Sequence, residues 1–136
     1  MKTRLICMFS MAVVALFSLF AFRSANESEL TLLMRDIFDE AMAAKQAIAA
    51  GEEPKFEIDL DAILTAKATV DAKTSNPNYR PKAEAYLEAM EAFKTSEVAQ
   101  RKKAFNAVVD ACMACHRSVC PGPMMRIQKL YFKNTD

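Results

Sequence analysis

Apolar residues recur at the spacing of an α-helix in four separate segments of this chain, and no other feature constrains the fold as strongly. The segments cover about residues 27–50, 57–73, 78–94 and 97–119. In each, apolar side chains recur every three or four residues and form one stripe on a helix. The chain has only 2 Gly and 5 Pro among 136 residues, which favours helices. Long helices joined by short loops lie antiparallel, so we predict an all-α, up-down-up-down four-helix bundle.

The ends of the predicted helices carry recognisable stop and start signals. Asn26 is a candidate cap for the first helix, with Glu29 as its capping-box partner. Gly51 is placed to end that helix in the left-handed conformation. Pro121-Gly122-Pro123 ends the fourth helix and begins a basic and aromatic C-terminal tail, residues 121–136. We expect the tail to pack on the bundle, with docking on a partner protein as the alternative.

The N-terminus reads as a targeting segment. Lys2 and Arg4 precede an uncharged apolar run, residues 5–22, which is typical of a secretory signal peptide over residues 1–25. The run is also nearly long enough to be retained as a membrane anchor. Both readings place the main domain, residues 26–120, outside the cytoplasm, as in a periplasmic protein. Without residues 1–25 the net charge is −2, which gives no support for nucleic-acid binding.

Three residues near the end of the fourth helix carry the chemistry. Cys112, Cys115 and His116 form a C-x-x-C-H motif, the attachment sequence for a covalently bound haem c. On a helix these positions share one face, so both thiols and the imidazole should point the same way. The motif predicts two thioether links to one haem and His116 as the proximal iron ligand. A redox dithiol and a zinc site are the alternatives, although His116 is the only histidine.

With this motif on the last of four helices, residues 27–119 resemble the class II cytochromes c, which include the cytochromes c′. The resemblance implies a haem between the first and last helices. It also implies that Met34 on the first helix is the sixth iron ligand, with simple core packing as the alternative. The neighbouring Arg35 is implied to pair with a haem propionate, and a solvated surface charge is the alternative for it. Met42 is the second candidate ligand. Five-coordinate iron, or ligation by Met90, Met124 or Met125, stays open.

The resemblance also implies a function. A six-coordinate member transfers electrons between redox partner proteins, whereas a five-coordinate member of the cytochrome c′ type binds nitric oxide or carbon monoxide. The chain has no second histidine for acid or base work, so we do not expect an enzyme. A homodimer is a further implication of the resemblance. Cys120 is left over once haem occupies the motif, and either an intermolecular disulfide or a buried thiol accounts for it.

Overall fold

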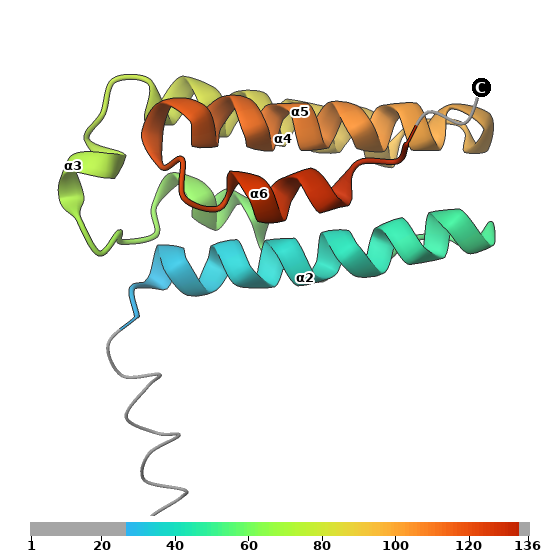
Figure 1. Ribbon diagram of the computed structural model, residues 1–136, viewed down its shortest axis with the longest axis horizontal. Helices are drawn as coiled ribbons and strands as arrows, with labels where there is room; N and C mark the ends of the chain where they lie inside the picture. Colours follow the sequence, from blue (N-terminus) through green and yellow to red (C-terminus); the bar gives the residue numbers. More distant parts are fainter. Residues whose placement is uncertain (1–26, 134–136) are drawn as a thin grey trace, which may run out of the picture.

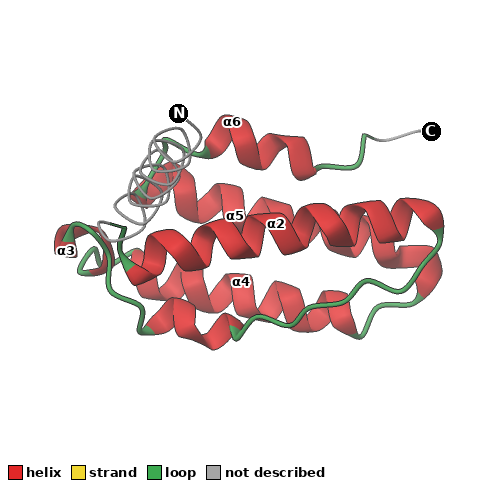
Figure 2. Ribbon diagram, turned by 90° about the horizontal axis from the view of Figure 1, so that it is seen from below, coloured by secondary structure: helices red, strands yellow, loops and turns green. Residues whose placement is uncertain are grey.

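The computed structural model describes residues 27–133, and within that range the chain is entirely helical (Figures 1 and 2). The all-α class is therefore confirmed for this part of the chain. In order, the elements are α2 (Glu29–Ala50), η1 (Leu60–Leu64), α3 (Asp71–Thr74), α4 (Tyr79–Lys94), η2 (Val98–Gln100), α5 (Arg101–Val119), α6 (Met124–Ile127) and η3 (Gln128–Leu130). Here η denotes a 3₁₀ helix.

The predicted signal peptide or anchor, residues 1–25, lies outside the described residues. Among the helices of residues 27–133, none combines the length and the apolar character needed to cross a bilayer.

Helix α2 ends where the sequence predicts but begins two residues later. Ser28, not Asn26, is its N-cap, and the Ser28 hydroxyl accepts a hydrogen bond from the Thr31 N–H at 3.3 Å. The predicted cap at Asn26 is therefore wrong, because the helix begins at Glu29. At the other end Gly51 has φ 76°, a left-handed conformation that costs glycine little. This confirms Gly51 as the helix stop.

The predicted second helix, residues 57–73, does not form. Only η1 and α3 are helical in or near this range, and the chain between them is irregular. The backbone groups of Lys67 instead form hydrogen bonds with α2. The Leu30 N–H donates to the Lys67 carbonyl, and the Lys67 N–H donates to the Glu29 carboxylate. Thr65 and Thr69 are also weak helix formers, since both branch at Cβ. Leu60 and Ile63 of η1 still reach the core.

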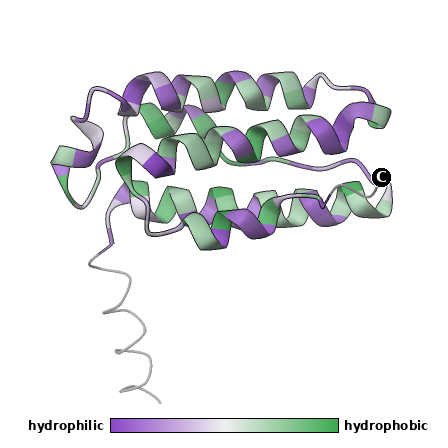
Figure 3. Cartoon of the chain, turned by 45° about the horizontal axis from the view of Figure 1, so that its top comes forward, coloured by the Kyte–Doolittle hydropathy of each residue, from purple (hydrophilic) through white to green (hydrophobic). Residues whose placement is uncertain are grey.

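The third predicted helix is confirmed as α4. The fourth is confirmed as α5, except that its predicted start forms the 3₁₀ helix η2. Helices α4 and α5 pack against each other. Phe93, Phe105 and Val109 are the largest fully buried side chains between them and their neighbours. Each long helix carries both hydrophobic and hydrophilic residues around its circumference (Figure 3). The buried stripe of each helix thus meets the same core.

The C-terminal tail packs on the domain, as predicted. We call residues 121–132 the strap; it lies between α2 and α5 (Figure 1). The Lys45 ammonium of α2 donates to the carbonyls of Lys129 and Tyr131 at 2.7 and 2.8 Å. Asn106 of α5 binds both the N–H and the carbonyl of Phe132. The strap therefore covers part of the domain, whereas the predicted second helix does not form.

Candidate functional site

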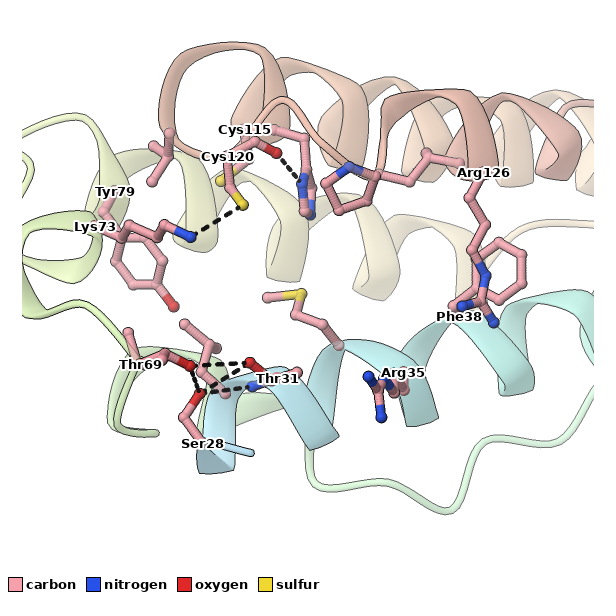
Figure 4. Close-up of a pocket in the computed structure, with 17 residues that line it drawn as sticks. Ser28, Thr31, Arg35, Phe38, Thr69, Lys73, Tyr79, Cys115, Cys120 and Arg126 are labelled. Carbon is pink, nitrogen blue, oxygen red and sulfur yellow. Dashed lines mark hydrogen bonds between the residues drawn. The ribbon is translucent and has the colours of Figure 1, made fainter. Parts of the chain in front are cut away.

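A cavity of about 360 Å³ lies between the start of α2, the end of α5 and the strap (Figure 4). Its walls are mainly apolar, and they include Leu30, Phe38, Val119 and Ile127. Polar and sulfur-bearing side chains reach it from four segments that are far apart in the sequence, namely the start of α2, residues 69–79, the end of α5 and the strap. Its size falls within the range of small-molecule sites in proteins.

Four of the five predicted site residues line this cavity. Met34 and Arg35 come from α2, and Cys115 and His116 come from the last turns of α5. Cys112 does not line it. Its thiol faces a separate enclosed space of about 20 Å³, which Tyr86 and Phe105 also line. The expectation that all three motif side chains share one cavity is therefore met only by Cys115 and His116.

The imidazole of His116 is oriented by the end of its own helix. Its Nδ1 lies 2.8 Å from the carbonyl oxygen of Cys120. A hydrogen bond from Nδ1–H to that carbonyl leaves Nε2 with its lone pair, the form in which histidine binds a metal. Cys120 has φ −150° and ψ 77°, outside the α region, which proline disfavours for the residue before it. Pro121 thus turns the Cys120 carbonyl back toward His116.

Of the five methionines considered as iron ligands, only Met34 lines the cavity. Met90 is buried in the core at 3% exposure, and Met125 is 75% exposed. Met42 and Met124 pack partly buried against the core, away from the cavity lining. The thioether of Met34 is therefore the one that shares a cavity with His116.

Arg35 lines the cavity at its edge, but its guanidinium is exposed and forms an ion pair with Glu27. An exposed ion pair of this kind contributes little to stability. The structure places Arg35 near the predicted site without aiming it at the cavity interior.

Several lining residues were not anticipated from the sequence. The hydroxyls of Ser28, Thr31 and Thr69 form a hydrogen-bonded cluster on one wall, with Ser28 and Thr69 3.0 Å apart. The Lys73 ammonium donates to the Cys120 thiol at 3.6 Å. Thr69 and Lys73 were missed because they lie in the segment wrongly predicted as a helix. No periodicity in the sequence marks them.

The electrostatics of the thiols disfavour a reactive dithiol. Burial raises the pKa of the Cys112 thiol to about 12, with Cys115 as a smaller cause. Burial also raises the pKa of Cys115, which Lys82 partly opposes. Redox dithiols of the C-x-x-C type instead have a lowered thiol pKa. Within residues 27–133, no group of three His, Cys, Asp or Glu side chains is arranged to hold a metal ion.

The donor set of the cavity suits a haem. An imidazole with a free Nε2 and a methionine thioether are the axial pair found in cytochromes c. Apolar walls suit the porphyrin face, and the Cys115 thiol stands next to His116 in the chain. Attachment at Cys112 requires its thiol to reach the same space from one turn earlier on α5.

Scans against protein-family models, curated proteins and solved structures found no match to this chain.

Proposed function

We propose that this protein is a mono-haem c-type cytochrome that transfers electrons outside the cytoplasm. One observation carries the proposal. His116 of the C-x-x-C-H motif and Met34 of α2 line the same apolar cavity, and the Cys120 carbonyl holds the imidazole ready to bind iron through Nε2. Haem c, when bound, supplies an iron that cycles between ferric and ferrous states.

Each of the predicted haem-binding residues has a defined role in this proposal. Cys112 and Cys115 would tether the haem, and His116 and Met34 would bind its iron. A methionine ligand would raise the reduction potential relative to weaker ligands. The apolar walls exclude water, and this burial also affects the potential. Electrons would then be exchanged with redox partner proteins.

The proposal extends to the fold. We infer that the domain is a reduced form of the up-down-up-down four-helix bundle of the class II cytochromes c. In it, α2, α4 and α5 supply three of the helices. The segment with η1 takes the place of the second, because Leu60 and Ile63 enter the core there.

The alternative function is a five-coordinate haem protein that binds nitric oxide or carbon monoxide. It differs at one point only, namely whether the Met34 thioether occupies the sixth position. The visible spectrum of the purified protein separates the two. A sharp α band in the reduced state indicates low-spin, six-coordinate iron, whereas a broad spectrum that changes on adding carbon monoxide indicates a free position.

The decisive experiment is expression in a host with cytochrome c maturation, followed by a pyridine haemochrome spectrum and an intact mass. We expect a mass increased by one haem. Cys112→Ser and Cys115→Ser should each lose one thioether and shift the haemochrome band. Cys120→Ser is the matched control and should leave the band unchanged. A colourless protein with the mass of the bare polypeptide would rule the proposal out.

A further inference from the structure

The cavity has an unusual charge pattern. Among its lining side chains are three permanent cations, Arg35, Lys73 and Arg126, and there is no carboxylate. The described chain as a whole is slightly acidic, with 15 Lys and Arg against 16 Asp and Glu over residues 27–133. An apolar cavity edged by cations is complementary to an apolar ligand that carries anionic groups.

Two of these cations, Lys73 and Arg126, lie at opposite ends of the cavity (Figure 4). Lys73 lies at the end with the thiols of Cys115 and Cys120, whereas Arg126 lies at the other end (Figure 4). In haem, the two carboxylates project from the porphyrin edge opposite the vinyl groups. Thioethers to the cysteines would fix the vinyl edge there, and the carboxylates would then be directed away from the cysteines. This geometry favours the end that holds Arg126.

The guanidinium of Arg126 is positioned but only weakly paired. It stacks on the Phe38 ring at 4.1 Å from the ring centroid, a cation–π contact that holds its plane. Its one ion pair among the described residues is to Asp39, at 3.4 Å and with both side chains more than half exposed. Such a pair contributes little. Arg126 therefore keeps donors for a bidentate carboxylate, while Arg35 is already paired with Glu27.

We propose that Arg126 of the strap binds a carboxylate of the haem by a charge-assisted, bidentate hydrogen bond. The inference rests on the proposed function and adds a cofactor-binding residue to it. It also gives the strap a role, since the segment that closes the cavity would carry the group that neutralises the cofactor.

The test is the midpoint potential of the haem-loaded protein measured between pH 5 and pH 9. In the Arg126→Gln variant the carboxylate loses its cation, so its pKa rises and its uncompensated charge favours ferric iron at high pH. We expect a three- to tenfold shift of the ferric–ferrous equilibrium at pH 8, about 28 to 59 mV downward at 59 mV per tenfold for one electron. The potential should also depend more steeply on pH.

The matched control is Lys129→Gln, which removes one exposed positive charge from the same strap without touching the cavity. It should leave the pH profile unchanged. Asp39→Asn frees Arg126 from its competing carboxylate and should make the potential depend less on pH. Asp36→Asn removes the same charge from a neighbouring exposed residue and is its control. These two variants at exposed positions provide a test even if Arg126→Gln does not fold.

The outcomes distinguish failure of the Arg126 contact from failure of the proposed cytochrome function. If Arg126→Gln follows the profile of Lys129→Gln, or Asp39→Asn that of Asp36→Asn, Arg126 does not bind the carboxylate and the cytochrome function stands. If the wild-type protein carries no covalent haem, the proposed function fails before any variant is compared.

Discussion

At the scale of single residues, Met34 decides between the two candidate functions. Its thioether is the only one among the candidate methionines that lines the cavity with His116. Met34→Ala should therefore convert a low-spin, six-coordinate spectrum to a high-spin one and allow carbon monoxide to bind. Visible spectroscopy of the reduced protein measures both changes. Met42→Ala is the control, since Met42 lies on α2 outside the cavity lining. A low-spin spectrum that survives Met34→Ala would exclude Met34 as the ligand.

Cys112 permits a second residue-scale test on protein produced without haem. With a pKa of about 12, its thiol is about one part in ten thousand thiolate at pH 8, against about a quarter for an unperturbed thiol near 8.5. Only the thiolate reacts with iodoacetamide. Because the folded state favours the protonated thiol, alkylation of Cys112 should be slow at pH 8 and should accelerate about tenfold per pH unit up to about pH 11.

Peptide mapping by mass spectrometry follows the Cys112 reaction, and the same measurement in urea is its control. Unfolding removes the burial that raises the pKa, so alkylation in urea should be fast already at pH 8. Equal rates with and without urea would contradict the protection of the partly buried Cys112 thiol by the fold.

The residues of the site divide into those that a motif marks and those that only the fold assembles. Cys115 and His116 are recognisable from their spacing, and Met34 from its place on an apolar stripe. The Cys120 carbonyl and Arg126 are not, because a backbone group and a surface arginine carry no pattern. Pro121 was a usable signal, since proline restricts the residue before it. From the sequence alone, Pro121 predicts the end of the helix but not the orientation of the Cys120 carbonyl.

At the scale of elements, helices can be predicted where local sequence signals decide, and the prediction fails where contacts with distant residues compete. Helices α2, α4 and α5 have continuous apolar stripes with clear ends, and all three were predicted. Residues 57–73 have a weaker stripe, with Lys67 at its centre. There, hydrogen bonds to Leu30 and Glu29 of α2 replace those of a helix. Stabilisation by hydrogen bonds to residues about 38 positions away cannot be predicted from the sequence of residues 57–73 alone.

The end of α2 gives a test of one such local signal. Gly51 has φ 76° and no atom within 4 Å of the place where a Cβ would stand. Gly51→Ala should therefore destabilise the protein by backbone strain alone, by about 1–2 kcal/mol. Urea denaturation measures this change. Gly122→Ala is the matched control, with equal space and no positive φ, and it should be close to neutral. Equal effects at both positions would contradict the left-handed cap.

At the scale of the whole molecule, the strap completes a domain whose second helix is missing. It joins α2 and α5 through polar contacts at its far end and covers the cavity with Pro123 and Ile127 near its start. Phe132 also extends a series of edge-to-face aromatic contacts that runs from Phe56 through Phe93 and Phe105. The sequence predicted that the tail packs on the domain, but not that it would form a wall of the site.

The attachment of the strap can be tested at Asn106, whose side chain donates to the Phe132 carbonyl at 3.2 Å and accepts from the Phe132 N–H at 2.9 Å. Asn106→Asp keeps the shape and the acceptor but replaces the donor with an oxygen that repels the carbonyl. Losing a partner of a part-buried group costs about 1–3 kcal/mol, so strap amides should exchange hydrogen about 5- to 160-fold faster. Amides in the middle of α4 should keep their protection, because the core does not depend on this contact. Gln128→Glu makes the same amide-to-acid change on an exposed strap residue and should leave exchange unchanged. If both variants exchange at the wild-type rate, Asn106 does not hold the strap and other contacts close the cavity.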